Sequence, residues 1–207
     1  NFALAYVGLA DAYLTLGAHF LGGLKIDESV ALAEPPLMQA LRLDPTLVEA
    51  QASLGMLRYL QGDEKAAEQA YDEAIALRPN YSRVFRRYGR LRWRQGRYDE
   101  ALQLMQQAMR LDPYSVPVNF DVARLDEELG RFDEALARYL RIIEVEPSHA
   151  FAHVYIAAIH YLVYGRADES LVWYRKAAEI DPSSPSLLVS QATAYLELGD
   201  PEGARTW

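Results

Sequence analysis

The chain has 207 residues, of which 51% are hydrophobic, and its 21 Lys and Arg against 29 Asp and Glu give a net charge of −8. This acidic balance argues against general binding to a nucleic-acid backbone. No stretch approaches the roughly 18 consecutive apolar residues of a membrane span, so no membrane insertion is expected. The absence of cysteine excludes disulfides and Cys-ligated metals but leaves the compartment open.

No targeting signal is recognised at either end of the sequence. No basic and then apolar leader follows Asn1, and Trp207 comes directly after a helix-like stretch. We therefore expect the chain to be a piece of a longer protein.

Proline and glycine recur along the chain at a fixed period. Five prolines follow one another at spacings of 34, 34, 34 and 35 residues, and five glycines at 34, 34, 35 and 34 lie midway between them. The prolines are Pro45, Pro79, Pro113, Pro147 and Pro182, and the glycines are Gly62, Gly96, Gly130, Gly165 and Gly199. A fixed period of this length indicates stacked structural repeats.

Each repeat is predicted to form a helix hairpin. Apolar and small residues return at helical intervals on both sides of the glycine, as at Phe85, Tyr88, Ala101 and Met105. Glycine closes the first helix because it enters a left-handed turn without steric cost, and proline prevents the second helix from continuing. Small residues where the two helices meet predict close packing and carry no chemistry.

These positions resemble the tetratricopeptide repeat family. Its 34-residue pattern is matched by Leu54-Gly55, Ala67, Tyr71, Ala74 and Pro79. The resemblance covers the chain as six repeats, at about 3–47, 48–81, 82–115, 116–149, 150–184 and, cut short, 185–207. It implies an all-α fold, a right-handed α-solenoid of stacked antiparallel helix hairpins forming one array.

Repeat one departs from the pattern because it holds about eleven extra residues near 18–29. We expect a packed loop there, with a short helix that Asp27 caps and that ends at Ala33. Pro35 and Pro36 fall inside the second helix, where a proline costs ~3 kcal/mol. That helix is therefore expected to break near Glu34 and restart at the prolines. In repeat five, one extra residue is expected in the turn at Tyr164-Gly165.

The opening of the chain also resembles part of a larger family of proteins. Residues 3–13, a long spacer and residues 40–45 are similar to the first repeats of bacterial regulators. In those proteins a winged-helix DNA-binding domain of the CadC-like group, or a cyclase domain, precedes the repeats. The resemblance implies a sensing or interaction part of a signalling protein.

The family resemblance places a partner-binding groove along the first helices. Such a solenoid has a concave face that suits an extended segment of another protein. The candidate binding residues are Met56, Tyr59, Arg83, Arg86, Arg90, Trp93, Arg94, Phe120, Arg124 and Tyr161.

Arginines crowd the first helix of repeat three, and two interpretations stay open. Arg83 and Arg94 could be neutralised by Glu49 and Glu128 in neighbouring helices. The remaining cluster of Arg86, Arg90 and Arg124 would then suit carboxylates and so bind an acidic segment. Self-association is a second function class, and nucleic-acid binding through this helix is a weaker one, because one basic helix in an acidic chain is a small electrostatic footprint.

No enzyme, cofactor or metal site is expected. His149 and His153 are four residues apart but lack the glutamate of a zinc-protease helix, and His153 and His160 occupy core positions of the repeat. Gly22-Gly23 lacks the lysine of a phosphate-binding loop and is expected to be a turn. The carboxylate clamp of chaperone-binding members does not transfer either, because Val7, Asp11 and Met56 replace its polar residues.

Overall fold

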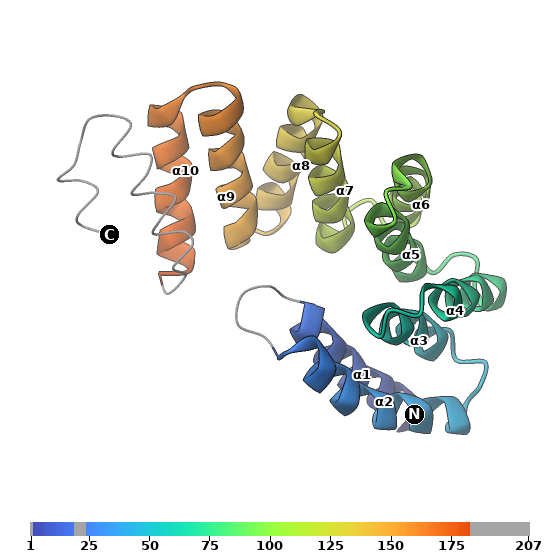
Figure 1. Ribbon diagram of the computed structural model, residues 1–207. Coiled ribbons are helices and arrows are strands. Elements are labelled where there is room, and N and C mark those ends of the chain that lie inside the picture. Colours follow the sequence, from blue (N-terminus) through green and yellow to red (C-terminus); the bar gives the residue numbers. More distant parts are fainter. Residues whose placement is uncertain (1, 19–23, 183–207) are drawn as a thin grey trace. The chain divides into compact units, whose positions relative to one another are not determined.

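The computed structural model describes residues 2–18 and 24–182, and Figure 1 shows helices joined by short turns throughout this part of the chain. The sixth repeat, 185–207, and the centre of the expected insertion, 19–23, lie outside the described residues. The helices are α1 (Phe2–Ala18), α2 (Ile26–Leu43), α3 (Val48–Leu60), α4 (Glu64–Leu77), α5 (Ser82–Arg94), α6 (Tyr98–Leu111), α7 (Val116–Glu128), α8 (Phe132–Val145), α9 (Ala150–Ala158), the π-helix η1 (Ile159–Val163) and α10 (Ala167–Ile180). The expected all-α repeat fold is confirmed.

The chain divides into two compact units, residues 1–113 with α1–α6 and residues 114–207 with α7–α10 among their described helices. In each unit, the two helices of a repeat pack against each other. Small buried residues line these contacts, such as Ala67, Ala70 and Ala74 beside Tyr71 on α4. Each core is thus a row of hairpin interfaces.

Glycine ends the first helix of four repeats, as the sequence predicts. Gly62, Gly96, Gly130 and Gly165 have φ values of +80°, +71°, +74° and +66°. At the first of these turns, the Asp63 N–H donates to the Arg58 carbonyl at 2.9 Å. This bond uses a carbonyl that the end of α3 would leave without a donor.

At one contact between the helices of a hairpin, only glycine fits. A Cβ at Gly55 of α3 would lie 2.3 Å from the Tyr71 ring of α4. The Tyr71 ring is fully buried and cannot move aside. The small residue at this position therefore sets how closely the two helices approach.

The expected break in the second helix of repeat one is wrong. The α2 helix runs without interruption from Ile26 to Leu43 with Pro35 and Pro36 inside it. Its buried face against α1, which includes Ala33 and Leu37, holds the helix together across the prolines. Pro35 and Pro36 leave the carbonyls of Ala31 and Leu32 without N–H donors, and because both of these residues are exposed, their carbonyls can bond water.

The insertion lengthens the two helices of repeat one. Helix α1 has 17 residues and α2 has 18, against 13 and 14 in α3 and α4. The expected short helix ending at Ala33 is therefore wrong, and so is the cap, because the N-cap residue is Lys25 without a side-chain bond. Buried Ser29 donates to the Tyr13 carbonyl at 2.7 Å, which fixes the extra turn of α2 against α1.

The extra residue of repeat five lies in its first helix and not in the turn. Residues Ile159–Val163 form a π-helix, in which the Tyr164 N–H bonds the Ile159 carbonyl at 3.2 Å. A π turn holds one more residue than an α turn. In the turn that follows, Gly165 has a positive φ like the glycines of the other three turns, but the Arg166 N–H bonds the His160 carbonyl six residues back, where the other turns span five.

Candidate functional site

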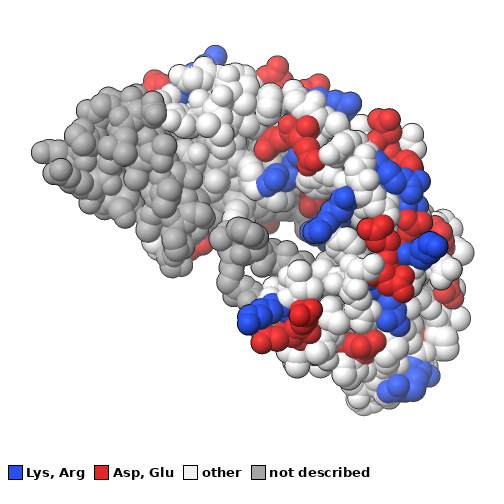
Figure 2. All heavy atoms as spheres, in the orientation of Figure 1, with Lys and Arg blue, Asp and Glu red and all other residues white. Residues whose placement is uncertain are grey.

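Helix α5 is the most basic element of the first unit. It carries six arginines and no acidic residue over Ser82–Arg94. At 100° per residue, Arg83, Arg86, Arg87, Arg90 and Arg94 share one side of the helix, and Arg92 lies on the opposite side. We call the shared side the arginine face. Figure 2 shows positive and negative side chains next to each other over this unit.

Two members of the arginine face bind a carboxylate from α1. Asp11 accepts from Arg83 Nη1 and from Arg87 Nη2, each at 2.8 Å. Ser53 of α3 donates to the same carboxylate at 2.5 Å and accepts from Arg87 Nη1 at 3.0 Å. We call these four residues the Asp11 network, and they join α1, α3 and α5.

The expected pair of Arg83 and Glu49 is wrong. Glu49 accepts from Arg78 Nη1 at 2.7 Å, and Arg83 reaches past the neighbouring repeat to Asp11. Asp11 is the one ionisable group among the described residues of α1 other than the tyrosines. A lone charge in an otherwise apolar helix was the signal that could have identified it.

On the opposite side of α5, Arg92 is buried among partners within its own unit. It forms a hydrogen bond with Glu68, lies 3.4 Å from Glu100 and donates to the Tyr88 hydroxyl at 2.6 Å. Although burial opposes the effect, the hydrogen bond from Arg92 keeps the pKa of Glu68 below its ordinary value. Arg92 is thus a structural residue.

Arg90 and Arg94 remain on the arginine face beside an aromatic ring. The Arg94 guanidinium lies 5.4 Å from the centre of the Tyr59 ring. Burial raises the pKa of Tyr59, and the positive charges of Arg94 and Arg90 oppose that rise. Among the described residues, no carboxylate pairs with Arg90 or Arg94. Exposed Arg94 and half-buried Arg90 and Tyr59 thus form a positively charged surface.

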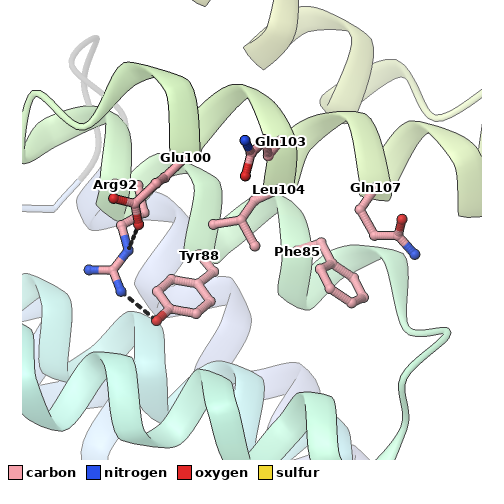
Figure 3. A pocket seen from close by; sticks show the side chains of 7 residues that line it. All are labelled: Phe85, Tyr88, Arg92, Glu100, Gln103, Leu104 and Gln107. Atoms are coloured by element: carbon pink, nitrogen blue, oxygen red, sulfur yellow. Dashed lines mark hydrogen bonds and ion pairs between the residues drawn. The ribbon is translucent and has the colours of Figure 1, made fainter.

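A separate hollow of about 280 Å³ lies between α5 and α6. Figure 3 shows Phe85 and Tyr88 on one side of it, with Leu104, Gln103 and Gln107 on the other. The Arg92 contact with Glu100 closes one end. This volume lies just below the usual range of pockets for drug-sized ligands.

In the second unit, two of the three predicted residues, Phe120 and Arg124, lie in an aromatic cluster. The Phe120 ring meets Tyr139 and Tyr155 edge-on at 5.7 and 5.5 Å, and Tyr155 stacks on Tyr139 at 5.3 Å. Arg124 lies 4.4 Å above the Tyr155 ring and donates to its hydroxyl. The sequence predicted Phe120 and Arg124 as binding residues but not Tyr155, whose ring contacts both side chains.

Three described histidines contact neighbouring residues of the fold, and His160 Nδ1 lies 3.1 Å from Glu169 Oε2. His153 is buried, bonds the Pro147 carbonyl at 2.9 Å and lies 5.7 Å from the Trp173 ring. His149 caps α9 by accepting from the Ala152 N–H at 3.1 Å, and burial lowers its pKa. The described residues contain no group of three acidic or histidine side chains that could hold a metal ion.

The structure distributes the predicted binding residues between the two units. The N-terminal unit holds Met56, which is buried, Tyr59, Arg86, Arg90 and Trp93, which are half-buried, and the exposed Arg83 and Arg94; the C-terminal unit holds Phe120, Arg124 and Tyr161, all half-buried. Tyr161 lies in η1, so its position no longer corresponds to that of Tyr59. The role of these residues in binding stays a prediction.

None of the described helices combines the length and the apolar composition that crossing a bilayer requires.

Comparisons with known proteins agree on the repeat. Sequence models of the tetratricopeptide repeat match residues 92–155, residues 28–82 and 54–116, and residues 185–207. No curated protein sequence matches the chain.

Among solved structures, pilF of Pseudomonas aeruginosa superposes with a TM-score of 0.78 at 20% identity, over 99% of this chain and 88% of that one. PilW, described as a type IV pilus biogenesis factor, gives 0.76 at 18% identity over 99% and 89%. YrrB, described as a repeat protein with an unusual peptide-binding site, gives 0.59 at 20% identity over 91% of each chain. These likenesses show the fold.

Proposed function

Because this chain belongs to the tetratricopeptide repeat family, whose members generally act as protein-interaction scaffolds, we propose that it is a non-catalytic scaffold that binds a segment of a partner protein. Within the N-terminal unit, the contact surface is Arg86, Arg90 and Arg94 with the Tyr59 ring. The observation that carries this proposal is the pair of arginines, Arg90 and Arg94, left without a carboxylate partner in the described residues.

The charge balance of α5 indicates an acidic partner. Asp11 neutralises Arg83 and Arg87, and Glu68 and Glu100 neutralise Arg92. Arg90 and Arg94 lie four residues apart, where like charges cost about 0.2–0.5 kcal/mol. A carboxylate between them would remove this repulsion and accept charge-assisted hydrogen bonds. The segment therefore carries Asp or Glu at this surface.

The surface beside these arginines supports an apolar contact next to the acidic one. Tyr59 is half-buried, and Arg94 covers one part of its ring. Half-buried aromatic rings and arginines are common anchors at protein interfaces. We therefore expect the segment to place an apolar side chain near its carboxylate.

Binding of labelled peptides tests this proposal. The peptides are ten-residue sequences of one length and several net charges, measured by fluorescence anisotropy. Acidic peptides with one aromatic residue should bind, and the variant with Arg90→Glu and Arg94→Glu should lose about tenfold or more in affinity. The matched control is Arg110→Glu, because Arg110 is exposed on α6 and bonds only Gln107 among the described residues.

Two results would count against this surface. Equal binding of acidic and basic peptides would remove the argument from charge. An unchanged affinity in the double variant would move the binding site away from Arg90 and Arg94. The scaffold function would then have to rest on another face.

The contacts of the α5 arginines give nucleic-acid binding less support than the sequence alone does. Three of the six arginines of α5 are held by carboxylates, so the free positive charge is smaller than their number suggests. Affinity for single-stranded DNA that falls steeply with salt would favour this alternative.

We also infer that the chain serves within a larger bacterial regulatory protein. The support is the resemblance of residues 3–13 and 40–45 to the first repeats of such regulators. Sequencing the complete gene that encodes the chain tests this inference. A winged-helix or cyclase domain in the same reading frame would support it, and a frame without an effector domain would contradict it.

A further inference from the structure

The hydroxyl of Tyr71 is a buried hydrogen-bonding group without a partner. Tyr71 lies on α4 and is fully buried, and among the described residues no atom forms a hydrogen bond with its side-chain oxygen. A hydroxyl in this state has lost its bonds to water and gained none in return, so such groups are rare in folded proteins. An orphaned hydroxyl below a candidate binding surface therefore calls for a functional explanation.

The Tyr71 hydroxyl points from α4 toward the arginine face of α5. The ring passes α3 at Gly55, where an added Cβ would lie 2.8 Å from Cζ, the ring atom that carries the hydroxyl. Burial raises the pKa of Tyr71, and the largest effects opposing that rise are the charges of Arg87 and Arg90. The hydroxyl thus lies between α3 and α5, below the proposed binding surface.

Tyr59 lies over the same region. It follows Gly55 by one helical turn on α3, and a helical side chain leans over the turn before its own Cα. The Tyr59 ring is therefore next to the end of Tyr71, and Tyr59 is a further group that acts on the pKa of Tyr71. Tyr59 is only half-buried, so its ring can rotate and uncover the hydroxyl.

Repeat four shows which group the Tyr71 hydroxyl lacks. Tyr139 on α8 and Glu127 on α7 stand 68 residues after Tyr71 and Tyr59, which is two repeats further along the chain. Tyr139 is as fully buried as Tyr71, and its hydroxyl donates to Glu127 Oε1 at 2.6 Å. Where repeat four has this carboxylate, repeat two has the Tyr59 ring. The tyrosine of repeat two is therefore left without an acceptor.

We propose that the partner segment supplies the missing carboxylate. An aspartate or glutamate of the segment enters between Tyr59 and Arg90 and accepts hydrogen bonds from the Tyr71 hydroxyl and the Arg90 guanidinium. The inference rests on the proposed function, and it assigns the recognition of the acidic residue to particular donor atoms. Because Arg90 is charged, a carboxylate should bind here more tightly than the neutral amide of a glutamine.

A carboxylate already occupies the equivalent surroundings in repeat four. Burial raises the pKa of Glu127, and the hydrogen bond from Tyr139 and the charge of Arg124 oppose that rise. Repeat two has the same kind of donor in Tyr71, with the positive charge of Arg90 acting on it. Among the described residues, no carboxylate pairs with Arg90. A carboxylate suits both groups, because it is negatively charged and accepts several hydrogen bonds.

A double-mutant cycle between the chain and a peptide tests the proposal. The probes are a ten-residue peptide with one glutamate and one phenylalanine, and the same peptide with glutamine in place of the glutamate, both measured by fluorescence anisotropy. Tyr71→Phe should weaken binding of the glutamate peptide about tenfold and that of the glutamine peptide less than about twofold. A purely structural role of Tyr71 would weaken both peptides equally.

Stability measurements separate the two tyrosines. Tyr71→Phe removes a hydroxyl that has no partner, so the midpoint of urea denaturation should stay unchanged or rise. The matched control is Tyr139→Phe, which leaves Glu127 without its donor. This control should lower the urea midpoint and leave the binding of both peptides unchanged.

A carboxylate placed in the chain itself should mimic the bound state. Tyr59→Glu gives repeat two the residue type that repeat four has at this position. It should have a higher urea midpoint than Tyr59→Gln, and this difference should shrink when Tyr71→Phe is also present. Tyr59→Glu should also weaken binding of the glutamate peptide at least about tenfold, because the site is then filled from within.

Three results would overturn the proposal. They are equal weakening of the two peptides by Tyr71→Phe, no weakening of either, and a Tyr59→Glu variant no more stable than Tyr59→Gln. If the variant with Arg90→Glu and Arg94→Glu loses binding while Tyr71→Phe does not, the arginine surface stands and the contact with Tyr71 is wrong. If no acidic peptide binds the wild type, both proposals fail.

Discussion

The two units join their first helices by different chemistry. In the N-terminal unit, α1, α3 and α5 are connected by the charged Asp11 network. In the C-terminal unit, α7, α8 and α9 meet through the rings of Phe120, Tyr139 and Tyr155. The same hairpin backbone therefore accepts an ionic or an aromatic connection at its first helices.

The difference predicts how each unit responds to a single substitution. Removing one partner of a buried ion pair leaves the other charge uncompensated, which costs about 3–5 kcal/mol. An aromatic contact is worth about 0.5–1.5 kcal/mol beyond the area it buries, and a neighbouring ring can still fill the space. The N-terminal unit should thus be the more sensitive of the two.

Asp11→Ala should have the largest effect. It leaves the buried Arg87 guanidinium without a carboxylate, so the free energy of unfolding of the N-terminal unit should fall by about 3–5 kcal/mol. Hydrogen exchange with mass spectrometry reads each unit separately. The control Asp72→Ala, at an exposed site on α4, should change it by less than about 0.5 kcal/mol. Equal effects of the two variants would remove the contrast between the units.

Gly55→Ala tests the close helix contact within the same unit. The new methyl group would meet the Tyr71 ring, and overpacking of this kind costs about 1–3 kcal/mol. In the C-terminal unit Ala123 stands at the corresponding position, so Ala123→Gly should cost only about 1 kcal/mol through helix propensity. Urea denaturation measures both. A stabilised Gly55→Ala variant would show that α3 and α4 can move apart.

Tyr155→Leu tests the aromatic connection. It removes the stacking on Tyr139, the edge contact with Phe120 and the ring below Arg124. We expect a loss of about 1–2 kcal/mol confined to exchange in α7–α9. Tyr155→Phe, which keeps the ring and removes the hydroxyl bonded to Arg124, should cost less. A loss as large as that of Asp11→Ala would contradict the comparison.

A change of pH should give the smallest effect. Burial lowers the pKa of His149 below 6.5, so the unfolded chain binds the proton more readily than the folded one. The stability from this group is complete above pH 6.5 and declines as the pH falls below that value. Protonation also removes the acceptor that caps α9. His149→Asn keeps a capping side chain and should remove this part of the pH dependence.

In that experiment the measurement is thermal melting at pH 7 and pH 5. An unchanged pH dependence in His149→Asn would assign the effect to other groups.

The fold could be predicted from the sequence because the turn residues are local. Each positive φ in the described residues belongs to a glycine that recurs at a fixed spacing. Each described second helix ends before the proline that closes its repeat. The continuous α2 could not be predicted in the same way. Whether a helix tolerates Pro35 and Pro36 depends on the burial of its other face, which is a tertiary property.

The candidate site was only partly predictable for a related reason. Sequence position indicates which residues share a helix face, and it identified Arg83 to Arg94 correctly as one basic element. It paired Arg83 with Glu49 in the adjacent helix, whereas the structure pairs it with Asp11, 72 residues away. The long Arg83 side chain extends from α5 to α1, past the repeat between them, and such a contact cannot be predicted from positions in the sequence.

The π turn of repeat five has a consequence for how such a chain can change in length. One residue added to an ordinary α-helix rotates everything after it by about 100°, which would turn the buried side of the next helix toward water. Here Ile159–Val163 takes up the added residue, and α10 still buries Leu171 and Tyr174. Loss of one codon within η1 would therefore return this segment to an ordinary α-turn and keep α10 in register.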